Sequence, residues 1–295
     1  MFIRIGFEIE IDCAQPTTLI LALSPHSDYV GARFGSDQVH ASGVELQTFV
    51  DPFDNRLTRL RAPAGRLTFW SDCIVENDGQ PDPYDWNARQ HEVADLPPET
   101  LPFLTPSRYC DSDVLAPEAM RIFGQTEPGW ARVQEICNFV QVHLTFGYGF
   151  GRSSKTASDA MREKTGVCRD FAHLAIALCR AMNIPARYAS GYLGDIGAPF
   201  SGAGDFSAWF EAYLDGRWHT FDARHNTPRI GRVLMVRGRD AADGAMITSF
   251  GAYDLMKFKV WTDEVSDTTS EAAMLSLLES RPDVEGVVLA PTVNP

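Results

Sequence analysis

The sequence contains no run of about 18 apolar residues, the length that a helix needs to cross a bilayer, so we expect no membrane span. Basic residues are in deficit: 26 lysines and arginines stand against 39 aspartates and glutamates, which gives a formal net charge of −13. This charge repels nucleic acid and anionic membrane surfaces, and we expect neither as a partner. A signal peptide needs a continuous apolar core, which Glu8 and Glu10 interrupt here. The sequence therefore predicts a cytoplasmic location.

Cysteine is scarce and scattered. The six cysteines include no C-x-x-C pair, and no cluster of histidine or cysteine has the spacing of metal ligands. A nucleotide-binding motif is absent as well, so we expect no metal and no cofactor. Scattered cysteines in a long cytosolic chain are most often reduced and buried, which leaves room for one or two chemically active ones.

Strict alternation predicts a half-buried strand over Ile3–Ile11, with apolar side chains on one side and charged ones on the other. Several short strands separated by turns indicate an antiparallel β domain over residues 1–76. Residues 77–116 are rich in proline and polar residues and are predicted to form a linker. The remaining strands predicted in the β domain are Thr18–Leu23, Gly43–Val50, Arg56–Arg61 and Arg66–Val75.

Helical periodicity begins after the linker, over Trp130–Leu144, and recurs at 157–164 and Val167–Met182. Helices that are followed along the chain by the strands of an antiparallel sheet indicate an α+β fold class. We place this core at residues 117–265, followed by a C-terminal tail, 266–295, to which the sequence assigns no structure. The strands predicted for the core are Ala186–Leu193, Phe206–Leu214 and Arg217–Arg224.

Cys168 lies at the opening turn of the predicted helix Val167–Met182. Backbone N–H groups and the positive end of the helix dipole favour a thiolate there, which is the reactive form of cysteine. Cys179 lies deep in the same helix and lacks this effect. Position alone leaves Cys168 open to two interpretations, a core cysteine or a nucleophile. Asp170 is interpreted as an acid that stabilises the first turn.

A longer pattern surrounds Cys168. The segment TGVCRDFAHLAIALCRAMNIPARYASGYLGD resembles the nucleophile segment of bacterial transglutaminase-like proteins, in which a cysteine opens a helix. The later segment FSAWFEAYLDGRWHTFDAR resembles that family's A-W-x-E-x-Y-L-x-G-x-W-x-x-F-D signature. Both stand in the family's order, and the resemblance covers about residues 125–235. It implies a papain-like transglutaminase core, preceded by an antiparallel β domain.

The resemblance also implies a catalytic mechanism. A cysteine attacks an amide carbonyl, a histidine on the next strand takes the thiol proton, and an aspartate on the following strand orients the histidine. By position, Cys168 is the nucleophile and Asp222 the orienting acid. The histidine should precede Ala208-Trp209, but this sequence has Ser207 there. A serine hydroxyl cannot accept a proton near neutral pH, so general-base help worth about 10²–10⁴-fold is missing at this position.

Hairpin geometry supports the same placement independently of the resemblance. If the Asp-Gly dipeptide at 215–216 forms a two-residue turn, Trp209 faces Asp222 across the ladder. Ser207 then lies on the same side as both. A base at position 207 would therefore stand next to Asp222, and the residue present has the wrong chemistry.

Other histidines offer a replacement base. His225 lies three residues past Asp222, and a bend after the strand would turn its imidazole back toward the site. His219 has the opposite register and faces away, and His173 lies well round the helix from the thiol. We therefore keep His225 as the candidate for a relocated base, with a structural or surface role as the alternative for every histidine.

These observations predict a transglutaminase-like cysteine hydrolase or acyltransferase, such as a cysteine protease, that acts on peptide or protein amide bonds through a Cys168 thioester. The alternative is a catalytically impaired scaffold that keeps the cleft to bind a peptide or protein partner. The sequence does not decide between hydrolysis and transamidation, and it gives no oligomeric state.

Overall fold

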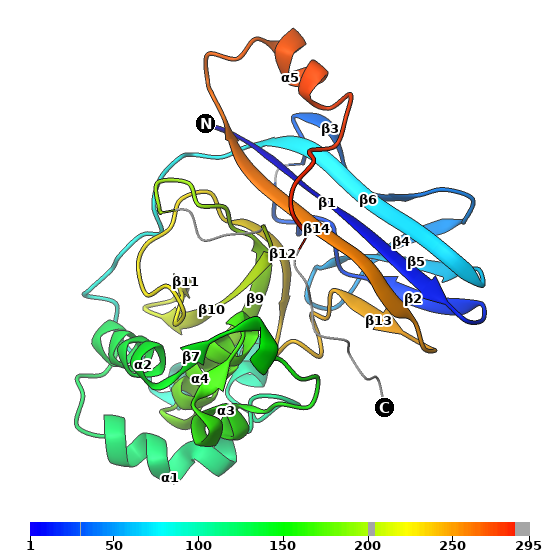
Figure 1. Cartoon of the computed structure of the whole chain (residues 1–295). Coiled ribbons are helices and arrows are strands. Elements are labelled where there is room, and N and C mark those ends of the chain that lie inside the picture. The colour runs from blue at the N-terminus through cyan, green and yellow to red at the C-terminus, as the bar shows by residue number, and fades with distance from the viewer. Residues whose placement is uncertain (30, 200–203, 287–295) are drawn as a thin grey trace.

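Antiparallel sheets and a group of helices make up the protein (Figure 1). The structure is a computed structural model that describes residues 1–29, 31–199 and 204–286. Within these residues there are three four-stranded sheets and one two-stranded sheet. The predicted N-terminal antiparallel β region and the predicted α+β class are both confirmed.

The first sheet has the strand order β14-β1-β6-β3. Its strand β1 (Phe2–Cys13) pairs along its length with β6 (Gly65–Glu76) on one side and β14 (Asp254–Val265) on the other. Strand β3 (Phe34–Ala41), which alternation did not predict, forms the far edge. The five alternating apolar side chains of β1 are at most 1% exposed, so the predicted burial of this face is confirmed: Ile3, Ile5, Phe7, Ile9 and Ile11.

The second sheet has the strand order β13-β2-β5-β4, with β2 at Thr17–Leu21, β4 at Leu46–Val50 and β5 at Arg56–Ala62. Strand β13 (Ile247–Ser249), like β14, comes from the second half of the chain and pairs with an N-terminal strand. Both strands fall inside the range 117–265 that we assigned to the core. The division of the chain into domains stays a prediction.

The third sheet belongs to the second half of the chain and has the strand order β11-β10-β9-β12. Helix α4 (Cys168–Ala181) packs on β9 and β10, and the other three helices before the sheet contact α4 (Figure 1). The bounds of these elements are α1 (Ser112–Phe123), α2 (Trp130–His143), β7 (Thr145–Phe146), α3 (Ala157–Glu163), β8 (Thr165–Gly166), β9 (Ala186–Tyr192), β10 (Phe206–Leu214), β11 (Arg217–Phe221) and β12 (Val233–Gly238).

The segment that we predicted as a linker packs against the core. It contains two short 3₁₀ helices, η1 (Val93–Asp95) and η2 (Pro98–Phe103), and Phe103 is buried. Helix α1 begins at Ser112, inside the predicted linker range 77–116. A third 3₁₀ turn, η3 (Tyr148–Phe150), lies between α2 and α3.

One hydrophobic core joins the N-terminal sheets to the third sheet. Phe206, at the start of β10, connects them: its ring centroid is 6.1 Å from that of Phe7 on β1 and 5.8 Å from that of Phe258 on β14. On its own sheet it contacts Tyr192 at 5.1 Å. Strand β10 is therefore held from both sides, which fixes the strand that carries Ser207.

The end of the chain returns to the outer face of the first sheet. After β14, helix α5 (Glu271–Leu277) lies next to β3, and the following residues cross the sheet (Figure 1). Residues 287–295, part of the predicted tail, lie outside the described residues. In the part of the chain that the structure describes, no helix has the length and apolar character needed to span a bilayer. The cytoplasmic location stays a prediction.

Candidate active site

Cys168 is the first residue of α4. Val167, just before it, has an extended backbone, and its N–H donates to the Asp170 carboxylate at 2.9 Å, which closes the first turn. Asp170 is thus a helix-start acid, as interpreted from the sequence. Cys168 keeps partial exposure, whereas the other five cysteines are buried. At the start of α4, this residue is therefore less buried than the other five cysteines.

The surroundings of the thiol suppress its ionisation. Burial, followed by the negative charge of Asp205, raises the pKa of Cys168 to about 11. The Arg224 guanidinium and a hydrogen bond from the Ala208 backbone N–H act in the opposite direction. We expected the helix start to lower this pKa; desolvation of the thiol and the neighbouring Asp205 carboxylate act against that effect.

Ser207 lies on β10, immediately before the Ala208 N–H that contacts the thiol. The predicted hairpin register is observed, since Phe210 pairs with Phe221 and Leu214 with Arg217. Ser207 Oγ is buried, and no described atom is placed to hydrogen-bond with it. That this serine occupies the position of a catalytic histidine stays a prediction.

Asp222 follows β11 and holds His225 directly. One carboxylate oxygen accepts hydrogen bonds from the backbone N–H groups of Arg224 and His225, each at 3.0 Å. The other oxygen lies 2.9 Å from His225 Nδ1 and 2.9 Å from Arg232 Nη2. Burial opposes ionisation of Asp222, but Arg232 and His225 hold its pKa well below the usual range. The bend that we proposed for His225 is therefore present, and it brings the imidazole to the Asp222 carboxylate.

The other candidate histidines lie elsewhere. His219 packs edge-on against Trp130 of α2, with ring centroids 5.4 Å apart, and its Nε2 lies 3.2 Å from the Leu214 carbonyl oxygen. His173 stacks on Tyr109, and burial lowers its pKa to about 3. Both contacts are those of structural histidines.

A cavity of about 390 Å³ opens beside Ser207 and His225. Ser207, Arg224 and His225 line it from the third sheet and its following loop, and strand β14 forms another wall. Cys168 itself is not among the lining residues, but two groups whose charges act on its thiol, Asp205 and Arg224, are. Within residues 1–29, 31–199 and 204–286, no cluster of three or more His, Cys, Asp or Glu side chains is placed to hold a metal ion.

Asp205 is a site residue that the sequence analysis missed. Its carboxylate hydrogen-bonds to the Tyr148 hydroxyl, and burial raises its pKa to about 6. The same burial, with the charge of Asp205, raises the pKa of Tyr148 to about 12. A signal was present in the sequence, because Asp205 precedes Ser207 by two residues, and strand alternation places such residues on one side.

Comparisons with known proteins show similarity to one protein family. Residues 119–223 match the model of the transglutaminase-like superfamily, a range that contains Cys168, Ser207 and Asp222. An uncharacterised protein of Mycobacterium leprae is 31% identical over 221 residues, which are 70% of this chain and 76% of that protein. The human kyphoscoliosis peptidase is 30% identical over 93 residues, 30% of this chain and 14% of that protein.

A solved structure is similar over almost the whole chain. The crystal structure of a "putative cysteine protease" from Cytophaga hutchinsonii is 31% identical, covers 92% of each chain and has a TM-score of 0.79. Coverage of this extent includes the N-terminal sheets as well as the third sheet and its helices. The predicted arrangement, a β region followed by a helix-and-sheet core, is therefore confirmed as one that a related protein shares.

Proposed function

Because the chain belongs to the transglutaminase-like superfamily, we propose that it is a cysteine hydrolase or acyltransferase that acts on peptide or protein amide bonds through a Cys168 thioester. The family and the fold support a general papain-like function. The observation that carries the finer proposal is the 2.9 Å contact between His225 Nδ1 and Asp222 Oδ2. In this contact, Asp222 orients the imidazole of His225, and Ser207 offers no such group. His225 lines the same cavity as Arg224, whose charge acts on the Cys168 thiol.

The proposed reaction assigns one role to each group. Nδ1–H of His225 donates to Asp222, which leaves Nε2 free to accept the thiol proton. The thiolate of Cys168 attacks the amide carbonyl, the C–N bond breaks, and the imidazolium returns the proton to the departing amine. Water or a second amine then attacks the thioester and releases an acid or a new amide. The mechanism requires His225 Nε2 to reach hydrogen-bond distance of Cys168 Sγ when substrate is bound.

A second candidate function is a peptide-binding scaffold without catalysis. The thiol pKa of about 11 favours it, because an unactivated thiol is almost entirely protonated at neutral pH. The buried serine at position 207 favours it too, since it offers no base. In this reading the cavity binds a peptide and Cys168 remains unreacted.

A single experiment separates the two functions. The wild type and Cys168→Ala are incubated with a mixture of synthetic peptides in the presence of hydroxylamine, and the products are identified by mass spectrometry. Hydroxylamine captures a thioester as a hydroxamate, so the enzyme should yield cleaved or hydroxamate products that Cys168→Ala does not. If both proteins leave every peptide unchanged, the enzymatic proposal fails. Peptides that are retained unmodified on the protein would then support the scaffold.

A further inference from the structure

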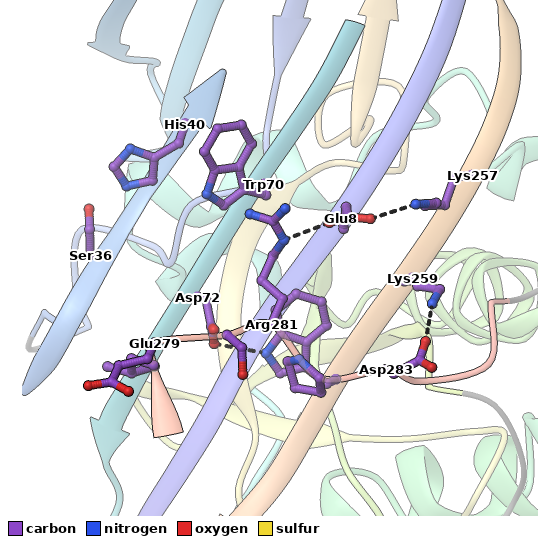
Figure 2. Close-up of a pocket in the computed structure, with 14 residues that line it drawn as sticks. Glu8, Ser36, His40, Trp70, Asp72, Lys257, Lys259, Glu279, Arg281 and Asp283 are labelled. Carbon is purple, nitrogen blue, oxygen red and sulfur yellow. Dashed lines mark hydrogen bonds and ion pairs between the residues drawn. The ribbon is translucent and has the colours of Figure 1, made fainter. Parts of the chain in front are cut away.

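A second and larger cavity, of about 620 Å³, lies on the outer face of the first sheet, away from Cys168. Figure 2 shows its floor, formed by side chains of β1, β6 and β14, and the chain that passes over them after α5. We call residues Glu279–Gly286 the C-terminal segment. The cavity is the space between this segment and the sheet, and it is lined by tryptophan and by charges of both signs, namely Glu8, Trp70, Asp72, Lys257, Lys259 and Trp261.

Arg281 attaches the C-terminal segment to the middle of the sheet. Its Nε lies 2.6 Å from Glu8 Oε2, and its guanidinium lies 4.9 Å from the centroid of the Trp70 ring (Figure 2). Glu8 also binds Lys257 at 2.8 Å. An arginine side chain is thus recognised here by a carboxylate and by an aromatic face together.

Two further contacts hold the segment on the sheet. Asp283 Oδ1 lies 2.9 Å from Lys259 Nζ on β14 (Figure 2). Arg4 Nη2, on β1, donates to the Ser280 carbonyl oxygen at 2.6 Å. The basic and the acidic side chain of Arg281-Pro282-Asp283 therefore bind opposite charges on the sheet. These contacts select a peptide chain that carries a basic residue and, two positions later, an acidic residue.

The segment continues from this face into the candidate active site. Trp261 lines both cavities, and Val284 and Glu285 line the cavity that contains His225. Next to them, a Cβ atom on Gly286 would lie 2.8 Å from the Phe258 carbonyl oxygen, so the chain runs close against β14. The two cavities thus share Trp261 of β14 as a wall, and the C-terminal segment lines both.

We propose that these two cavities, which meet at Trp261, form a binding surface for an extended peptide with a basic and an acidic residue two positions apart, and that the C-terminal segment is its intramolecular occupant. The inference rests on the proposed function in one respect: the peptide that lies on this surface leads to the Cys168 site. Binding of the peptide itself requires no catalysis.

The structure explains why the segment can be displaced. It has no regular secondary structure, and most of its side chains are exposed. Its ion pairs are partly open to water, with Arg281 40% and Asp283 101% exposed, and such pairs contribute little stability. A tethered segment nevertheless competes strongly with a free peptide, because its effective concentration reaches the millimolar range.

The test measures binding of a fluorescent synthetic peptide, ESRPDVEG, which reproduces residues 279–286. Fluorescence anisotropy is compared for the wild-type chain and Arg281→Glu, which places a second negative charge beside Glu8. The variant should release its own segment and bind the peptide about tenfold more tightly. Arg66→Glu is the matched control, since it breaks an exposed ion pair with Glu10 on the same sheet without touching the segment. It should bind as the wild type does.

Two comparisons locate the binding. Adding Glu8→Gln to the Arg281→Glu chain should weaken peptide binding again, and the charge-exchanged peptide ESDPRVEG should bind at least about tenfold less well. The inference is overturned if Arg281→Glu binds the peptide no more tightly than the wild type does. It is also overturned if ESRPDVEG and ESDPRVEG bind equally well. Because Arg281 is exposed, its substitution should leave the thermal midpoint unchanged. Asp283→Lys is an independent variant that should also release the segment, because it places a second positive charge beside Lys259. Tight peptide binding without amide turnover would contradict the proposed function and leave this inference intact.

Discussion

Removing the negative charge of Asp205 should make the Cys168 thiol more reactive. Burial and the Asp205 carboxylate raise the pKa of Cys168 to about 11, so Asp205→Asn removes one of the two largest effects. If the thiol pKa falls by about one unit, the thiolate fraction at neutral pH rises about tenfold. The intrinsic nucleophilicity of a thiolate falls roughly threefold over the same unit, so the alkylation rate should rise about threefold.

The pH dependence of the same variant gives a sharper test. Burial raises the pKa of Asp205 to about 6, so its carboxyl is charged above about pH 6 and neutral below it. The charge suppresses the thiolate only where it is present. The rates for the wild type and Asp205→Asn should therefore differ above pH 6 and converge below it. The measurement is modification by a pyridyl disulfide reagent, resolved by residue with mass spectrometry.

Asp263→Asn is the matched control for this prediction. Asp263 lines the same cavity, and burial raises its pKa as well, but it is not among the principal groups that act on the thiol. Its substitution should leave the rate unchanged. In every variant, Cys168 should react before the five buried cysteines. An Asp205→Asn rate that is equal to or below the wild-type rate above pH 6 would refute the electrostatic reasoning.

Three further changes test the site and the fold. Ser207→His should accelerate alkylation of Cys168 near neutral pH, because an imidazole beside Asp222 can take the thiol proton; an unchanged rate would contradict this placement. His225→Ala should lower amide turnover about 10²-fold or more in steady-state kinetics while the circular dichroism spectrum is retained; full turnover would exclude His225 as the base. Gly6→Ala should lower the free energy of unfolding in urea by about 1–3 kcal/mol, because the new Cβ atom would meet both the Ser71 carbonyl oxygen and the Trp261 ring at 2.4 Å. A midpoint equal to that of the wild type would contradict this packing argument.

Local patterns in the sequence predicted most of the strands and helices. Alternation located β1, and helical spacing located α2, each to within two residues. Helix α1 was missed because Pro117 lies inside it and the prolines before it indicate a linker. Strand β3 was missed because its residues are mostly polar and partly exposed, without a clean alternation. The pairing of β14 with β1 depends on residues far apart in the chain, and no local signal specifies it.

The site was predictable to the extent that it follows from local geometry. Asp215 and Gly216 both have positive φ, of 46° and 83°, which is the turn that the Asp-Gly dipeptide predicts, and the hairpin register follows from it. The contact between His225 and Asp222 was an open alternative, because it depends on how the chain bends after β11. The effect of Asp205 on the thiol depends on tertiary packing between a loop and α4, which the sequence pattern does not encode.

The position of β1 between β6 and β14 also bears on how the protein folds during synthesis. Asp12 on β1 pairs with Asp254, 242 residues later, so the ribosome must add all of these residues before this pairing can form. Until then, β1 exposes one unpaired edge, and such an edge is a template for association with other chains. Contacts of such long sequence separation also slow folding. A nascent chain that stops before β14 should therefore recruit chaperones or aggregate, and β1 should be among the last strands to complete its hydrogen bonds.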